Sequence, residues 1–478
     1  MAQMIGETVS DSPTSGLFKS ILKHEVQKAL GCTEPGAVAF AAAIAAQVLK
    51  DGGKFSPDNI EKVWVTVCPG VMKNGAAVTL PGTEGQGIGL PLAAALGVLA
   101  ANPDGLNTLQ GVDAKAREQA ACLVCQNHVG LSSTEGSEFF IEVKLEMKNG
   151  VTSEVQITGG HTHVASVKKN EKDVPWNSIS ENGNGTSTDV PLSDLSYRER
   201  LRKCSFEDLI AMAGELSIKD ARYVKLGVDM NLRLAKVGLE MGRPAVASLQ
   251  KMVIHNVSAP SLETNIKLMV AAATSARMGG ADVPAMSSGG SGNQGVDTTL
   301  PPYLFGKDKN IPEDRILKSI ALAHIINAYC KAFFGDLAPA CGCAVSAGLG
   351  ATAAIAYQIN PTLEAVTCAI QNLTAMIAGM LCDGASEGCA AKVVVAADAI
   401  LWAGCAAGYG DNLSGGAAGI VGKTAEETIK NLNRVIQGML PLDPEINDVI
   451  RMNAGNVHRA CFKRPPLSAM AQLSTFEV

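Results

Sequence analysis

Large aromatic side chains are scarce in this sequence. Phe, Trp and Tyr together make up 4% of the 478 residues, whereas hydrophobic residues make up 47% and glycine occurs 49 times. A core of this composition is expected to consist of small side chains on closely approaching helices rather than of large rings. The length by itself predicts two or more folding units.

The sequence also lacks the features of nucleic-acid-binding, exported and membrane proteins. Its formal net charge is -6 at pH 7. This acidic balance gives no reason to expect a basic surface that would bind nucleic acid or an anionic membrane. The N-terminal segment has no basic stretch followed by an apolar run, and we expect no signal peptide. Residues 337–363 carry no charge, but they are rich in Ala and Gly, which predicts a packed internal helix rather than a membrane span.

The thirteen cysteines do not have the spacing of a disulfide scaffold. An odd number of scattered thiols, in a chain for which no export signal is expected, is typical of a reducing compartment. We therefore expect a cytoplasmic protein that keeps some of its thiols for metal binding or catalysis.

Hydrophobic periodicity predicts an α+β fold with two domains. In residues 1–195, helical patterns at 17–29, 33–50, 90–102 and 113–127 accompany strand patterns at 62–70, 138–150 and 153–167. We expect these strands to form a short antiparallel sheet. Residues 169–195 are polar and predict a surface insertion or linker.

The second predicted domain, residues 196–478, is all-α. No strand signal of weight and no internal repeat is found in it. The expected helices are 205–217, 219–239, 260–278, 312–333, 343–357, 362–380, 389–407 and 424–437.

Five cysteines stand at predicted helix ends rather than in helix middles. A helix N-terminus has unpaired N–H groups and a partial positive charge, which favour the thiolate that binds metal or accepts a proton. The spacing matches neither a zinc finger nor a ferredoxin, so a metal or cluster site and a set of buried structural thiols both remain open. These cysteines are Cys32, Cys341, Cys343, Cys382 and Cys389.

Two other pairs have simpler interpretations. Cys122 and Cys125 fall within a predicted helix and are interpreted as core cysteines one turn apart. His161 and His163 occupy alternate positions of a predicted strand, so both side chains would lie on the same face of the sheet. Such a pair could bind a metal ion. Without a nearby carboxylate, exposed strand histidines are the expected interpretation.

A glycine-rich stretch at residues 287–303 matches G-x-G-x-x-G between Gly290 and Gly295. A dinucleotide site needs a strand before this motif and a helix after it, and the sequence predicts neither. The backbone N–H groups of such a loop, with Ser291, Asn293 and Gln294, would suit a small carboxylate. A simple connecting loop is the alternative.

A weaker anion-binding pattern follows the first predicted strand. Lys73 and Asn74 could contact an anion, and Gly82-Thr83 would form a glycine turn beside them. A plain turn explains the same residues.

Taken together, these stretches resemble the L-cysteine desulfidase family, relatives of the iron–sulfur L-serine dehydratases. The matching segments occur in order between about residues 20 and 410. They are "ALGCTEPGAVA", "KNG" with "LPGT", "SARMGGADVPAMSSGGSGNQG", "CGCAVSAGLG" and "GMLCDGASEGCAAK".

The resemblance implies a lyase that uses a [4Fe-4S] cluster and no pyridoxal phosphate, and that converts L-cysteine to pyruvate, ammonia and sulfide through an aminoacrylate. It implies that Cys382, Cys389 and either Cys341 or Cys343 bind the cluster, and that Cys32 is the catalytic base. The residues expected to contact the amino-acid substrate are Thr33, Glu34, Lys73, Asn74, Gly82, Thr83, Ser291, Gly292, Asn293 and Gln294.

Other functions remain open at this point. L-Serine dehydration needs the same machinery, since only the leaving group differs. A non-catalytic iron–sulfur or zinc sensor would use the same thiols. A pyridoxal enzyme would need a lysine to form a Schiff base, and Lys392 is the only lysine close to the proposed site. The small-residue helix faces are compatible with a homodimer.

Overall fold

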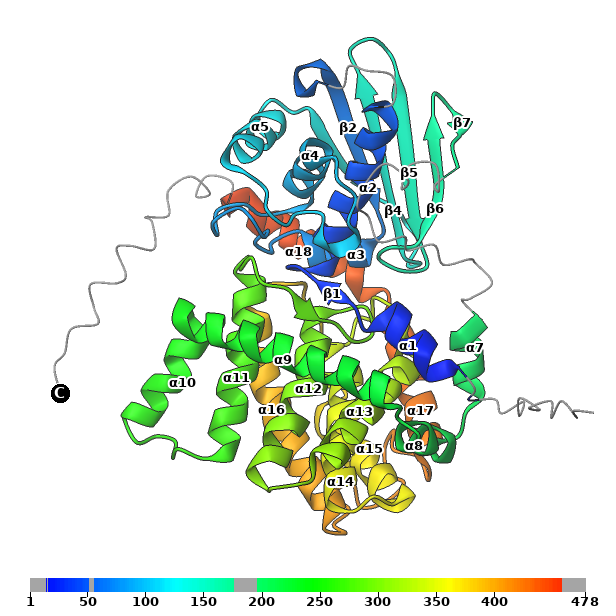
Figure 1. Ribbon diagram of the computed structural model, residues 1–478, viewed down its shortest axis with the longest axis vertical. Helices are drawn as coiled ribbons and strands as arrows, with labels where there is room; N and C mark the ends of the chain where they lie inside the picture. Colours follow the sequence, from blue (N-terminus) through cyan, green and yellow to red (C-terminus); the bar gives the residue numbers. More distant parts are fainter. Residues whose placement is uncertain (1–13, 15, 51–55, 176–195, 458–478) are drawn as a thin grey trace, which may run out of the picture.

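The computed structural model describes residues 14, 16–50, 56–175 and 196–457. A unit that contains the β-sheet lies on one side of a larger helical unit (Figure 1). The predicted α+β class is therefore confirmed, with a small sheet and a larger helical region.

The sheet has more strands than the sequence patterns predict. Its order is β3-β2-β4-β5-β6-β7, and every neighbouring pair is antiparallel except β2 and β3, which run parallel. The long connection through α3, α4 and α5 permits this parallel pairing, because a crossover can return the chain to the same end of the sheet. The strands are β2 (Ile60–Val67), β3 (Val129–Ser133), β4 (Phe140–Met147), β5 (Thr152–Thr158), β6 (Val164–Lys169) and β7 (Lys172–Asp173).

Alternation along β4 explains which face of the sheet is covered. Ile141, Val143, Leu145 and Met147 are buried, whereas the residues between them are partly exposed. The buried face packs against α2 (Thr33–Lys50), and α4 (Leu90–Ala100) packs in turn on α2.

The remaining elements of this unit are short. They are the 3-10 helices Pro57–Asn59 and Gly105–Asn107, α3 (Pro69–Gly75) and α5 (Ala114–Cys125). Cys122 and Cys125 are exposed in the last turns of α5, so the prediction of core cysteines is wrong. The helix buries only one of its residues fully, Ala120, and leaves both thiols in solvent.

The helical unit contains every helix predicted after residue 196 and several more. Its elements are α7 (Ser196–Lys203), α8 (Phe206–Gly214), α9 (Ile218–Met241), α10 (Pro244–Ile254), α11 (Leu262–Met278), α12 (Gly292–Asp308), α13 (Glu313–Phe334), a π-helix (Cys343–Ala347), α14 (Gly348–Ile359), α15 (Leu363–Ile377), α16 (Gly388–Gly408) and α17 (Ala425–Gly438).

Both ends of the described chain cross between the two units (Figure 1). The first helix, α1 (Leu17–Glu25), contributes to the core of the helical unit, and β1 (Lys28–Ala29) pairs with β8 (Ala285–Met286). At the other end, α18 (Leu442–Val457) packs against α3. The predicted boundary at residue 195 stays a prediction, and residues 176–195 of the expected linker lie outside the described residues.

Three local expectations need correction. The helix expected over residues 17–29 ends at Glu25, because the next residues become extended to pair with β8. The C-terminal part therefore contains a short strand. The glycine-rich stretch expected to be a loop enters α12 at Gly292, despite Pro301 and Pro302 within that helix. Packing against α11, α13 and α14 overrides the poor helix propensity of these residues.

The uncharged segment 337–363 contains the π-helix and α14, both largely buried, as predicted for an internal helix. Within the described part of the chain, α16 alone has the length and apolar composition that a membrane span needs. It packs against α11, α14 and α15, and 56% of its most apolar window is buried. This is the pattern of a core helix.

Close approach of α9 and α11 depends on Gly238. A Cβ at this position would overlap the backbone carbonyl of Ala272. We expect Gly238→Ala to lower the Tm, measured by circular dichroism, by about 2 °C or more, because overpacking costs about 2 kcal/mol when the backbone must shift. Gly438→Ala is the matched control, since a Cβ there meets no atom within 4 Å. An unchanged Tm for Gly238→Ala would contradict this packing.

Candidate active site

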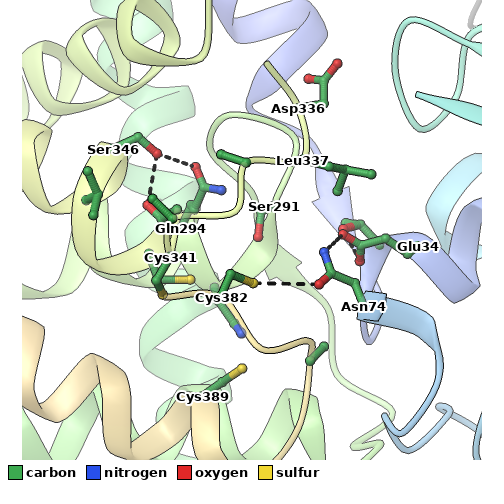
Figure 2. A pocket seen from close by; sticks show the side chains of 18 of the residues that line it. Glu34, Asn74, Ser291, Gln294, Asp336, Leu337, Cys341, Ser346, Cys382 and Cys389 are labelled. Atoms are coloured by element: carbon green, nitrogen blue, oxygen red, sulfur yellow. Dashed lines mark hydrogen bonds between the residues drawn. The ribbon is translucent and has the colours of Figure 1, made fainter. Parts of the chain in front are cut away.

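A cavity of about 90 Å³ lies where the sheet unit meets the helical unit, and it gathers most of the predicted site residues (Figure 2). The sheet unit and the segment before α2 supply one wall, and α12 with the cysteine-bearing loops supplies the other. The predicted residues that line it are Cys32, Thr33, Glu34, Asn74, Ser291, Asn293, Gln294, Cys341, Cys343, Cys382 and Cys389.

Four residues expected to contact substrate are not among those that line the cavity. Lys73 is buried, and its Nζ lies 2.6 Å from Oδ1 of Asp443, so it ties α3 to α18. Thr83 donates to the carbonyl of Leu80 at 2.7 Å, within the turn that contains Gly82. Gly292 begins α12.

Backbone pairing brings the thiols to one place. The segments at Ala340 and Leu381 form an isolated β-bridge. The Cys341 N–H donates to Met380, and the Cys382 N–H donates to Pro339. Cys389 follows in the first turn of α16. Figure 2 shows Cys341, Cys382 and Cys389 on the same side of the cavity.

Burial and mutual contact shift the pKa values of these four thiols. Burial raises the pKa of Cys382, and it raises the pKa of Cys389 to about 12. The hydrogen bond between Cys341 and Cys343 lowers the pKa of Cys341 and raises that of Cys343. Cys341 is thus the thiol of this group that ionises first.

The donor set fits a cluster better than a single ion. Within the described ranges, no three His, Cys, Asp or Glu side chains are placed to hold one metal ion together. A [4Fe-4S] cluster binds each thiolate through a different iron, so its ligands stand farther apart. Four thiols on one cavity wall have the chemistry that such a cluster requires.

Opposite the thiols, Glu34 accepts several hydrogen bonds. The Cys32 thiol donates to Oε2 at 2.9 Å and the Thr33 hydroxyl at 3.1 Å, while Asn74 Nδ2 donates to Oε1 at 2.9 Å. His161 Nε2 lies 3.7 Å from Oε1. Burial opposes ionisation, but nearby His161 and the donated hydrogen bonds outweigh it and hold the pKa of Glu34 well below its usual range. Glu34 is therefore a buried carboxylate.

Cys32 differs from the sequence-based expectation. It stands immediately before α2, where a lowered pKa was predicted. Instead, burial and the adjacent Glu34 carboxylate raise the pKa of Cys32 well above its usual value. The prediction of a resting thiolate is wrong, because loss of water and a neighbouring negative charge outweigh the helix terminus.

Asn74 connects the two walls of the cavity. Its Nδ2 donates to Glu34, and its Oδ1 accepts a hydrogen bond from the Cys382 thiol at 3.7 Å (Figure 2). The side chain of Asn74 thus lies between Glu34, the hydrogen-bond partner of Cys32, and Cys382, an expected cluster ligand.

Sequence reasoning missed several lining residues, among them His161 and Arg277. His161 and His163 lie in the turn between β5 and β6 rather than on a strand. His161 is buried edge-on against Phe139, with ring centres 4.8 Å apart, so the prediction of exposed strand histidines is wrong. The preceding Gly159-Gly160 pair was the available signal that the strand stops there.

Comparison with known proteins shows the family to which this chain belongs. Residues 145–441, which include the helical unit and its thiols, match the model of the serine dehydratase alpha chain. This is a family of lyases that are generally iron–sulfur dependent. The chain belongs to the serine dehydratase alpha chain family, which confirms the relationship indicated by the sequence motifs.

Similarity to curated relatives extends over nearly the whole chain. The UPF0597 protein of Geobacter sulfurreducens is 39% identical over 434 residues, which cover 89% of this chain and 96% of that protein. The UPF0597 protein of Elusimicrobium minutum is 38% identical over 440 residues, covering 91% and 99%. That of Desulfotalea psychrophila is 34% identical over 439 residues, covering 91% and 98%.

Proposed function

We propose that this protein is an iron–sulfur-dependent lyase that eliminates sulfide from L-cysteine to give pyruvate, ammonia and hydrogen sulfide. The observation that carries the proposal is the convergence of four candidate ligand thiols and the Cys32–Glu34 pair on one small cavity. The motif resemblance to the L-cysteine desulfidase family supports the choice of substrate.

The reaction requires both a base and an electrophile. The α-proton of an amino acid is very weakly acidic, so its removal needs a base held at the right distance. A bound [4Fe-4S] cluster with one open iron would supply Lewis acidity toward the carboxylate or the leaving sulfur. Cys382, Cys389 and either Cys341 or Cys343 would hold that cluster.

The chain's own residues provide a path for the proton. Cys32 donates to the Glu34 carboxylate in the resting state, and transfer of the thiol proton to Glu34 leaves a thiolate facing the cavity. Because the pKa of Cys32 is raised and that of Glu34 is lowered, this transfer is uphill and contributes to the barrier of the reaction. That thiolate takes the α-proton, the C–H electron pair forms the Cα–Cβ double bond, and the Cβ–S bond breaks. The sulfide leaves and takes up protons, and the aminoacrylate hydrolyses to pyruvate and ammonia.

L-Serine dehydration is the second candidate, because the family model that matches is named for that activity. A thiol leaving group has a greater affinity for iron than a hydroxyl, which favours L-cysteine. The homodimer, the two-domain division and the cytoplasmic location stay predictions.

The proposal is tested with anaerobically reconstituted protein. We expect pyruvate and sulfide from L-cysteine at a kcat/KM at least about tenfold higher than that for pyruvate from L-serine, which corresponds to about 1.4 kcal/mol. A preference for L-serine would reassign the substrate. A protein that carries the cluster and forms no pyruvate from either amino acid would be a sensor instead.

A further inference from the structure

Among the described residues, Arg277 is a buried cation with no carboxylate within ion-pair distance. It lies near the end of α11, is 2% exposed and lines the cavity. Its two terminal nitrogens donate to Oδ1 of Asn293 and to the carbonyl of Gly31, both neutral acceptors. Its Nε has no hydrogen-bond partner, and none of the ion pairs in the described part of the chain includes Arg277.

Such an arrangement is costly for an empty site. A guanidinium taken out of water loses hydration energy, and proteins normally return part of it through a carboxylate. Glu34 lines the same cavity, but its oxygens accept hydrogen bonds from Cys32, Thr33 and Asn74. An anionic ligand would therefore complete the coordination of Arg277.

The N-terminus of α12 lies against the same guanidinium. A Cβ at Gly292 would overlap the Arg277 head group, so only glycine lets the first turn approach this closely. The N-cap residue Ser291 makes no side-chain capping bond to this turn. The first N–H groups of a helix lack intrahelical partners, and the helix dipole adds a partial positive charge there.

We propose that Arg277 and the first turn of α12 together bind the α-carboxylate of the substrate, which makes Arg277 a specificity-determining residue. This inference rests on the proposed function, because it names the part of an amino acid that the cavity recognises. It assigns the reactive Cβ to the side of the cysteine thiols, and it excludes amines that lack a carboxylate.

The test is calorimetric binding of L-alanine to the anaerobic holoenzyme. L-Alanine keeps the carboxylate and the amine but has no leaving group, so binding is measured without turnover. We expect wild-type protein to bind L-alanine and not ethylamine. Arg277→Gln is expected to weaken L-alanine binding and raise the KM for L-cysteine by about 100-fold with iron content retained. Arg277→Lys, which keeps the charge but not the planar fork, should lie between the two.

The outcomes separate the two proposals. Exposed Arg233 on α9 provides the control variant Arg233→Gln, expected to match wild type. Equal affinity for L-alanine and ethylamine, no L-alanine binding by wild type, or unchanged affinity in Arg277→Gln would overturn the inference. Loss of iron in both Arg277 variants would instead mean that Arg277 balances the charge of the cluster. If L-alanine binds as expected but neither L-cysteine nor L-serine reacts, the proposed reaction fails and the carboxylate site stands.

Discussion

The Cys382→Ser variant is expected to lose the cluster and, with it, at least about 10³-fold of the lyase activity. The Cys382 side chain lines the cavity, and its backbone is fixed beside Cys341 by the pairing of Pro339 with Cys382. A hydroxyl is a hard, weakly acidic ligand that does not replace a thiolate on iron. Iron and sulfide analysis with visible absorption spectroscopy on anaerobic protein measures this loss.

The control for this experiment is Cys122→Ser. Cys122 is exposed on α5 and does not line the cavity, so we expect full iron content and full activity. Parallel Cys341→Ser and Cys343→Ser variants decide which of these two thiols binds the cluster, since one should lose it and the other should retain most of it. Full iron content in Cys382→Ser would contradict the ligand assignment.

Cys32→Ser is expected to have the opposite phenotype, with the cluster retained and turnover reduced by about 10³-fold. The Cys32 thiol donates a hydrogen bond to Glu34, and no hydrogen bond among the described residues joins it to the proposed ligand thiols. A serine can donate the same hydrogen bond, but its hydroxyl is far harder to deprotonate. kcat for L-cysteine and iron content, measured on the same preparation, distinguish the two roles.

Glu34→Gln tests the other half of the pair. The amide cannot take the thiol proton, so kcat should fall by about 100-fold or more while the iron content is unchanged. If Cys32→Ser loses iron as Cys382→Ser does, Cys32 is a ligand and the proton path proposed above is wrong. If Glu34→Gln keeps full kcat, the proton leaves Cys32 by another route.

The sequence patterns predicted helices and strands best where the apolar residues of an element recur with the period of that element. The strict alternation of β4 and the apolar spacing of α9, α11 and α13 are set by local periodicity, and the structure confirms those elements. The single strand expected over residues 153–167 is instead two strands, β5 and β6, joined by a turn. The sequence patterns did not predict α12, whose three glycines and two internal prolines disfavour a helix that packing stabilises.

The residues of the candidate site were also predicted only in part. The sequence motifs identified the thiols and Glu34, Asn74, Ser291 and Gln294, and all of these line the cavity. They did not single out Arg277, although it lies within the matching segment that begins "SARMGG". They also placed His161 in solvent, although Phe139 and Glu34 bury it.

The sequence alone determined which groups could react: thiols near helix ends, a carboxylate beside one of them, and a glycine-rich turn with amide donors. Tertiary structure decided their states. Burial beside Glu34 keeps Cys32 a thiol, and the absence of a side chain at Gly292 leaves room for Arg277 at a cavity it shares with the cysteines. The reason is physical, since the pKa of a group and the partners of a charge depend on solvent exclusion by residues distant in the chain.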